Sequence, residues 1–220
     1  MSLPLIRLGE VDSTQSFLRR HPELGFCAVM AEAQTVGRGR QGNAWVSAPG
    51  AGLWMSAAIP VPEIAPGLVL QKAMTAVIAA LPPAGLGLKW PNDLVVRRQD
   101  VLVKLGGILG ERLGERLILG IGLNLGAAPE LPERAFPAAC LAELVAPLPS
   151  APSLASDILE AWADLAAAPE PTFRWPAEGD PITWEGGQGV CLGWEPDGRL
   201  KVAAAAGVER LSAADVRGLR

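Results

Sequence analysis

One short stretch, GRGRQG at residues 37–42, restricts the fold of this chain more than any other. Its three glycines let the backbone turn tightly and approach a ligand, and its two arginines are permanent cations whose planar groups suit carboxylate or phosphate oxygens. The run that follows, NAWVSAPGAG at residues 43–52, holds two glycines and a proline, which argue against a helix. The stretch therefore predicts a loop that closes over an anion with a flat group attached, and a nucleotide or an adenylate is the first candidate.

The same stretch also matches the dinucleotide-binding pattern GxGxxG. That pattern requires a helix that begins inside the motif, so that the helix N-terminus meets the pyrophosphate. Because residues 43–52 argue against such a helix, a dinucleotide oxidoreductase is a weak alternative. On this motif alone, a solvated surface loop would be the preferred interpretation.

Composition narrows the class of protein. The 220 residues allow one domain of ordinary size, or a larger one with a small appendage. A net charge of −4 gives no reason to expect general binding to nucleic acid or membranes. The most apolar region, residues 57–88, is interrupted by Glu63 and Lys72, and the N-terminus lacks the apolar core of a signal peptide. The expectation is a soluble cytoplasmic protein. With one histidine and three widely spaced cysteines, a catalytic triad, a histidine zinc site and a disulfide framework are not expected.

Apolar runs bounded by glycine and proline indicate a mixed α/β organisation. They predict strands at residues 3–8, 26–31, 53–59, 101–110 and 116–125. Helical periodicity and capping residues predict helices at residues 14–20, 66–81 and 153–168. After the Pro-Glu-Pro run at 169–171 only short strands follow, with a hairpin turn at Asp197-Gly198. The chain is therefore predicted to have a main domain over residues 1–172 and a small β-barrel over residues 173–220.

Several polar residues stand inside or beside the apolar strands, and together they suggest one site. They are Ser13, Thr14, Gln15, Gln34, Lys89, Asn92, Asp93, Lys104 and Asn124. A lysine in an apolar strand is costly unless it pairs or meets an anion. Taken singly, Lys89 and Lys104 could each extend to the surface instead, and Asp93 could simply form a turn. Their joint occurrence beside the glycine–arginine loop favours a shared anion-binding site.

At this point the chain resembles a known family. The motifs GRGRQG at 37–42, KWPNDL at 89–94, KLGGIL at 104–109 and GIGLNL at 120–125, with VDSTQ at 11–15, are similar to the signatures of biotin protein ligases. The resemblance covers nearly the whole chain, and KWPND together with KLGGIL is highly specific. It implies an α+β fold, with a mixed β-sheet and flanking helices like the class-two synthetases, plus a C-terminal SH3-like β-barrel.

The resemblance also implies a reaction and its reactants. Biotin and ATP with Mg²⁺ would give biotinyl-5′-adenylate, and a lysine of a biotin carboxyl carrier domain of acetyl-CoA carboxylase, or of a related carboxylase, would then take the biotin and release AMP. The enzyme would be a carbon–nitrogen ligase. Repressor members of the family carry an N-terminal DNA-binding module; this chain begins at the catalytic domain, so DNA binding is not expected. A lipoate protein ligase and a non-catalytic relative that only binds biotin or the carrier are the alternatives, and monomer and homodimer both stay open.

Site roles follow from the resemblance by position. The biotin-binding residues would be Ser13, Thr14, Gln15, Gln34, Gly37, Arg38, Lys104 and Gly107. The cations that promote catalysis would be Arg38, Arg40, Lys89 and Lys104. The nucleotide would be contacted by Arg40, Trp45, Asn92 and Asn124, and Asp93 would be a ligand to Mg²⁺. Gln15 stands where the family usually has Asn, which keeps the amide but changes its reach.

Overall fold

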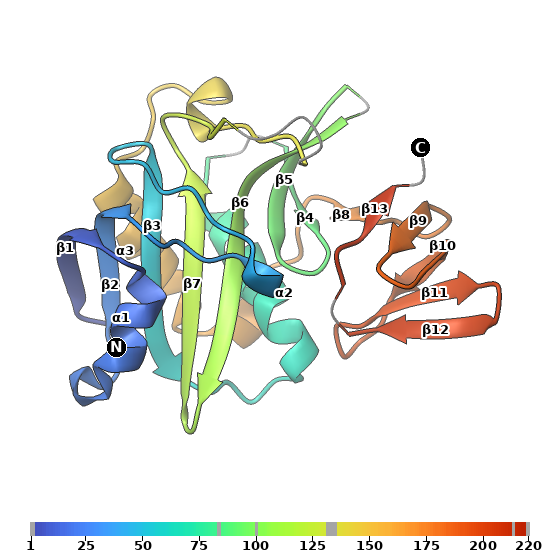
Figure 1. Ribbon diagram of the computed structural model, residues 1–220, viewed down its shortest axis with the longest axis horizontal. Coiled ribbons are helices and arrows are strands. Elements are labelled where there is room, and N and C mark those ends of the chain that lie inside the picture. The colour runs from blue at the N-terminus through green and yellow to red at the C-terminus, as the bar shows by residue number, and fades with distance from the viewer. Residues whose placement is uncertain (1–2, 83–84, 100, 131–135, 213, 219–220) are drawn as a thin grey trace.

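The computed structural model describes residues 3–82, 85–99, 101–130, 136–212 and 214–218, which form two sheets (Figure 1). The large sheet has eight strands in the order β1 (Leu5–Val11), β2 (Ala28–Gln34), β3 (Gly52–Pro60), β7 (Arg116–Asn124), β6 (Val101–Leu113), β5 (Asp93–Arg98), β4 (Leu86–Lys89) and β8 (Arg174–Trp175). The C-terminal sheet has five, in the order β12 (Gly207–Leu211), β11 (Leu200–Ala204), β10 (Gly187–Trp194), β9 (Pro181–Trp184) and β13 (Arg217–Gly218). This arrangement confirms the predicted α+β class.

The large sheet is mixed. Its β1–β2 and β4–β8 pairs are parallel, and its other neighbouring strands are antiparallel. A parallel pair needs a crossover connection, and α1 (Thr14–Arg20) supplies it between β1 and β2. The side chain of Ser13 caps this helix by accepting a hydrogen bond from the Ser16 amide.

Helices cover both faces of the large sheet. On one face, α2 (Pro66–Ala80) and α3 (Ala151–Trp162) contribute Met74 and Ile158 to a core that includes Leu53 and Met55 of β3. On the other face, Leu18 of α1 packs against neighbouring strands. Because successive strand residues point to opposite faces, the polar residues of β3 and β7 that face α1 lie outside the main core.

The strands predicted from apolar runs are confirmed, and so is the turn at Asp197-Gly198 between β10 and β11. The helix predicted over residues 153–168 is shorter: α3 ends at Trp162, and a separate 3-10 turn covers Leu165–Ala167. The side chain of Asp164 accepts a hydrogen bond from the Ala167 amide, which starts a new turn instead of continuing the helix. None of the helices in the described part of the chain has the length and apolar character needed to cross a membrane.

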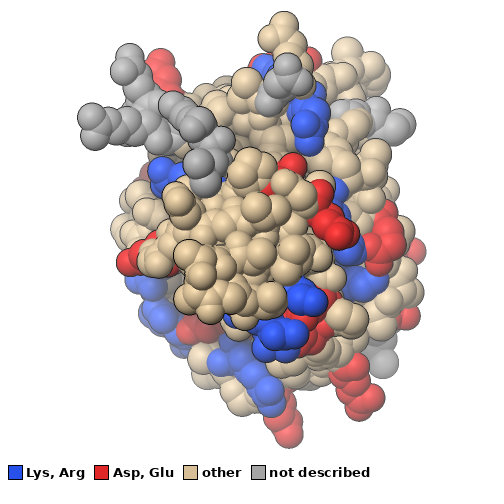
Figure 2. Space-filling view, turned by 90° about the vertical axis from the view of Figure 1, so that its right-hand side faces the viewer, with Lys and Arg blue, Asp and Glu red and all other residues tan. Residues whose placement is uncertain are grey.

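The C-terminal sheet lies beside the edge of the large sheet that ends in β4 and β8 (Figure 1). Its core consists of Ile182, Cys191, Leu200, Val202 and Val216 with Trp90, which comes from the large domain. Seen from this side, the centre of the molecular surface is mostly uncharged and the charged side chains gather toward its rim (Figure 2). Because β8 pairs with β4 in the large sheet, the chain enters the C-terminal sheet only at β9. The division into two domains after residue 172 stays a prediction.

Candidate functional site

A cluster of neutral hydrogen-bonding groups lies between the start of α1 and strands β2 and β3. The Thr14 amide donates to Oε1 of Gln34 at 2.8 Å, and the Thr14 hydroxyl lies 2.8 Å from Oγ of Ser56. Nε2 of Gln34 donates to Oγ of Ser47 at 2.8 Å. The structure therefore brings the predicted Thr14 and Gln34 together and adds Ser47 and Ser56. Ser56 is fully buried in an otherwise apolar strand, and that isolated polar residue was the signal that could have revealed it.

Ser13 and Gln15 flank this neutral cluster. Both are buried, and Ser13 uses its hydroxyl to cap α1. Gln15 points toward β7: a Cβ atom added at Gly120 would lie 2.9 Å from Oε1 of Gln15 and 3.2 Å from the hydroxyl oxygen of Ser56. Glycine at position 120 thus leaves the space in which the Gln15 amide reaches the cluster.

The glycine–arginine loop folds back on itself as an irregular hairpin. Gly37 accepts a hydrogen bond from the Trp45 amide at 2.9 Å, and Arg38 forms an antiparallel bridge with Ala44. A 3-10 turn spans Arg40–Gly42, and Gln41 has a positive φ of 55°. A Cβ at Gly37 would lie 2.3 Å from the Trp45 carbonyl oxygen, so only glycine allows this close approach. Because no α-helix begins in the motif, the dinucleotide-binding interpretation is excluded.

The side chain of Trp45 packs the glycine–arginine loop against the large sheet. A Cβ at Gly122 of β7 would lie 2.3 Å from the Trp45 indole, so the ring rests directly on the glycine backbone. The ammonium of Lys104 lies 5.3 Å from the centre of the same ring, within the range of a cation–π contact. Trp54 meets the ring edge-on, with the centroids 6.4 Å apart. Trp45 therefore closes one side of the site.

Two buried polar atoms near this ring have no hydrogen-bond partner among the residues that the structure describes. They are Nε1 of Trp45, a donor, and Oδ1 of Asn124, an acceptor. Asn124 is held by its Nδ2 group, which donates to the Ala139 carbonyl at 3.0 Å. Trp45 packs on Gly122, two residues before Asn124 on β7, so both groups belong to the same face. Leaving buried polar groups unpaired is costly, and such groups suit a ligand that has its own donors and acceptors.

A second cluster consists of charged groups around Asp93. Its Oδ1 lies 2.7 Å from Nζ of Lys104, and its Oδ2 lies 3.8 Å from Nζ of Lys89. Gly107 leaves room for this pair, since a Cβ there would lie 3.2 Å from Oδ1 of Asp93. The Lys89 side chain is only 3% exposed. Burial lowers its pKa from the usual lysine value, and the two nearby carboxylates of Asp93 and Asp215 oppose that effect in part.

Arg40 reaches this charged cluster from the loop. Its guanidinium donates to Oδ1 of Asn92 at 3.3 Å and to the Ala214 carbonyl at 3.4 Å. Asn92 is itself fixed, because its Nδ2 donates to the Ile108 carbonyl at 2.6 Å. Partial burial lowers the pKa of Arg40, and the carboxylates of Asp93 and Asp215 counteract that effect. Lys89, Lys104 and Arg40, three of the four predicted cations, thus form one cation cluster.

Arg38 is the predicted cation that lies apart from this cluster. Its side chain is exposed, and it forms no ion pair with any described residue. Asp215 of the C-terminal segment lies in the cluster and was missed: its Oδ1 is 3.8 Å from Nζ of Lys89. No motif near Asp215 could have revealed this contact, because it depends on how the C-terminal sheet packs against the large one.

Asp93 was predicted to be a Mg²⁺ ligand, and the structure places it between two ammonium groups. Within the described residues, no group of three or more acidic, histidine or cysteine side chains could hold a metal ion. These residues do not fit a protein-held metal centre. A contribution of Asp93 to an ion carried by a triphosphate stays a prediction, since Mg²⁺ usually binds substrate phosphates with only one or two carboxylates.

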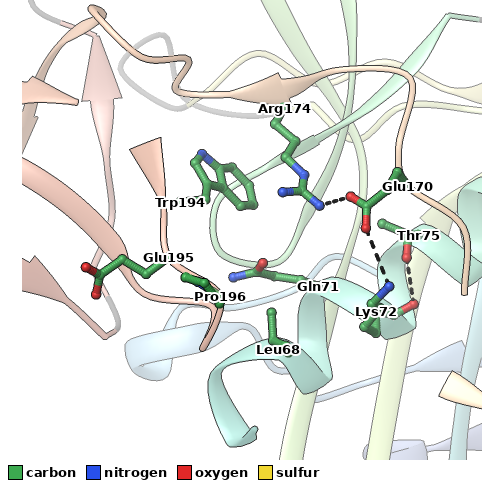
Figure 3. A pocket seen from close by; sticks show the side chains of 9 residues that line it. All are labelled: Leu68, Gln71, Lys72, Thr75, Glu170, Arg174, Trp194, Glu195 and Pro196. Carbon is green, nitrogen blue, oxygen red and sulfur yellow. Dashed lines mark hydrogen bonds and ion pairs between the residues drawn. The ribbon is translucent and has the colours of Figure 1, made fainter. Parts of the chain in front are cut away.

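Two cavities lie near these elements. A cavity of about 500 Å³ is lined by Gln34, Gly37, Trp45 and Ser47, among others, and borders the neutral cluster. A cavity of about 240 Å³ lies between α2, the segment before β8 and the C-terminal sheet (Figure 3). None of the predicted site residues lines the second cavity. The charged residues that line it already pair within the protein: Glu170 with Lys72 and Arg174, and Glu195 with Arg199 and Arg210.

The sequence of this chain is similar to a known protein family and to several named proteins. The model of the biotin/lipoate A/B protein ligase family matches residues 10–127, which is more than half of the chain. The biotin–[acetyl-CoA-carboxylase] ligase of Mycobacterium tuberculosis is 38% identical over 46% of this chain and 40% of that protein. The bifunctional ligase/repressor BirA of Escherichia coli is 35% identical over 52% of this chain and 38% of that protein. The chain therefore spans well under two thirds of the length of these relatives.

Solved structures are similar over nearly their full length. The biotin protein ligase of Aquifex aeolicus in complex with biotin and ATP has a TM-score of 0.75 at 24% identity, and the match covers 98% of this chain and 99% of that one. This likeness confirms the fold, including the SH3-like C-terminal sheet. The biotin protein ligase of Leishmania major in complex with biotinyl-5-AMP has a TM-score of 0.62 at 26% identity, covering 96% of this chain and 99% of that one. Motifs, fold and family model agree, and the chain belongs to the biotin/lipoate A/B protein ligase family.

Proposed function

We propose that the chain is an ATP-dependent biotin–protein ligase. It activates biotin as biotinyl-5′-adenylate and transfers the biotinyl group to a lysine of a biotin carboxyl carrier domain, such as that of acetyl-CoA carboxylase. One observation carries the proposal: the glycine–arginine loop joins the neutral cluster to the cation cluster. Gly37 and Trp45 border Gln34 and Ser47, while Arg40 reaches Asn92 beside Asp93. A ligand that is neutral and polar at one end and anionic at the other fits this arrangement.

The neutral cluster suits the ureido ring of biotin. That ring has two N–H donors and one carbonyl acceptor. Gln34 presents both a carbonyl oxygen and an amide group, and the hydroxyls of Thr14, Ser47 and Ser56 can donate or accept. Ser13 and Gln15 lie at the border of this cluster and complete the proposed biotin site.

The cation cluster suits the first chemical step. A carboxylate oxygen of biotin attacks the α-phosphorus of ATP, the bond to the β-phosphate oxygen breaks, and pyrophosphate leaves. Both reactants are anions, so fixed positive charges must offset their repulsion and the charge that develops during transfer. Lys104, Lys89 and Arg40 supply these charges, and Arg38 joins them from the loop when the nucleotide is bound. Mg²⁺ bound to the triphosphate supplies further charge neutralisation.

The unpaired atoms beside Trp45 suit the nucleotide. Oδ1 of Asn124 can accept a hydrogen bond and Nε1 of Trp45 can donate one, and Asn92 holds Arg40 at the phosphates. In the second step the amine of the carrier lysine attacks the acyl carbon, the bond to AMP breaks, and the amine loses a proton. The loop that carries Trp45 keeps water from the mixed anhydride until then.

The test uses the purified chain with isotopically labelled biotin, ATP, Mg²⁺ and a carrier domain, followed by mass spectrometry of the carrier. The proposal predicts the addition of one biotinyl group at a single lysine, and none when ATP is omitted. Lipoate is the competing acid in a parallel reaction. Modification by lipoate in preference to biotin, or no modification by either acid, would contradict the proposal.

A further inference from the structure

The segment of residues 214–216 passes close to the cation cluster. Ala214 and Val216 are buried in the core of the C-terminal sheet together with Trp90. The Asp215 side chain between them is 51% exposed and lies outside that core. Its two neighbours thus anchor the backbone, and the carboxylate is presented on the side of Lys89.

Trp90 ties this segment to the large domain. Its Nε1 donates to the Gly198 carbonyl at 3.0 Å, and Nε2 of Gln71 from α2 donates to the same oxygen at 2.6 Å. A Cβ at Gly67 would lie 2.3 Å from the Asp197 carbonyl oxygen, so the turn of the C-terminal sheet is tightly packed against α2. Because Trp90 follows Lys89 directly, the C-terminal sheet is held in a fixed position beside the cation cluster.

Two cations of the large domain meet acceptors of this one segment. Nζ of Lys89 lies 3.8 Å from Oδ1 of Asp215, and Arg40 donates to the Ala214 carbonyl at 3.4 Å. A carboxylate and a carbonyl oxygen are acceptors of the same kind as phosphate oxygens. Lys89 is at the same distance from Asp93, yet Asp93 also pairs closely with Lys104. Oδ2 of Asp215 accepts hydrogen bonds from Nε and Nη2 of Arg217 at 3.1 and 2.9 Å, and its Oδ1 is the oxygen nearest Lys89. Among the described residues, Asp215 therefore pairs with Lys89 and Arg217 but not with Lys104.

We propose that Asp215 acts as an internal competitor of polyphosphate: it balances the charge of Lys89 before a nucleotide binds, and the phosphates displace it. This inference rests on the proposed function for the identity of the anion. The three cations Arg40, Lys89 and Lys104 face the two carboxylates of Asp93 and Asp215, and the negative charge of Asp215 opposes an incoming phosphate. Asp215 thus weakens polyphosphate binding and speeds the release of pyrophosphate after the first step.

The experiment is isothermal titration calorimetry of the full chain with inorganic pyrophosphate, at low salt and without divalent cations. Asp215→Asn keeps the shape of the side chain and removes its charge. We expect Asp215→Asn to bind pyrophosphate roughly three- to tenfold more tightly than the wild type does, with a smaller difference at high salt. Asp215→Glu keeps the charge and is expected to bind as the wild type does. A variant that only damaged the structure would not bind more tightly.

The matched control is Glu209→Gln on the exposed edge strand β12, which makes the same change in net charge at a residue that forms no ion pair with any described residue. Its affinity for pyrophosphate is expected to stay within about twofold of the wild type. Equal or weaker binding by Asp215→Asn, or a gain of the same size in the control, would overturn the inference. The titration needs no biotin, so tighter binding without biotin transfer would support this inference while contradicting the proposed function.

Discussion

At the scale of single residues, Lys104 is the clustered cation that contacts both Asp93 and Trp45. It pairs with Asp93 at 2.7 Å and lies over the Trp45 ring, and its side chain is 26% exposed. Lys104→Ala is predicted to lower the rate of adenylate formation by about 10²–10³-fold, because one fixed charge at the phosphate is lost. Pyrophosphate release in the presence of biotin measures this rate. Lys201→Ala on β11 is the control, and equal rates in the two variants would contradict the assigned role.

The lowered pKa of Lys89 leads to a prediction about how the rate of adenylation depends on pH. Burial lowers its pKa below the usual lysine value of 10.5, and the proposed mechanism requires the charged form. The charged fraction falls as pH rises through the lowered pKa, so adenylation is expected to decline on the alkaline side earlier than for an ordinary lysine. Lys89→Arg keeps a permanent charge and should move this decline to higher pH. A pH profile of adenylation measures it, and an identical alkaline limb in both proteins would argue against Lys89 as its source.

At the scale of elements, the glycine–arginine loop can pack closely on β7 because Gly122 has no side chain. A Cβ at Gly122 would lie 2.3 Å from the Trp45 indole. Gly122→Ala is therefore predicted to displace Trp45 and to lower the amount of biotinyl-adenylate that stays bound through gel filtration. Gly126→Ala is the matched control on the same chain segment, because the nearest atom to its added Cβ is 3.6 Å away. Equal retention in both variants would show that the ring does not cover the adenylate.

The elements also show what sequence could and could not predict. The strands and the absence of a helix in the glycine–arginine loop followed from local patterns of apolar residues, glycine and proline. The grouping of Lys89 with Lys104 followed from the joint occurrence of their motifs. In the sheet the two lysines stand on β4 and β6, on either side of β5, and both reach Asp93. Ser47, Ser56 and Asp215 were missed, since their roles depend on contacts between segments far apart in the chain.

At the scale of the whole molecule, Trp90 joins the two sheets. Its ring is fully buried in the core of the C-terminal sheet, and its Nε1 donates to the Gly198 carbonyl. Trp90→Phe removes that donor and part of the buried volume, so we predict a loss of about 1–3 kcal/mol in the free energy of unfolding. Urea denaturation measures it. Trp184→Phe makes the same change on β9, where the ring is only partly buried, and an equal loss there would contradict a special role for Trp90.

The central claim is that a neutral polar pocket and a cation cluster, joined by one loop, bring an acid and a triphosphate together. Exchange of labelled pyrophosphate into ATP by the purified chain tests it most directly, because the exchange requires reversible formation of the adenylate. The account predicts exchange that depends on added biotin and is strongly reduced in Lys104→Ala. Exchange without biotin, or none with it, would contradict the account.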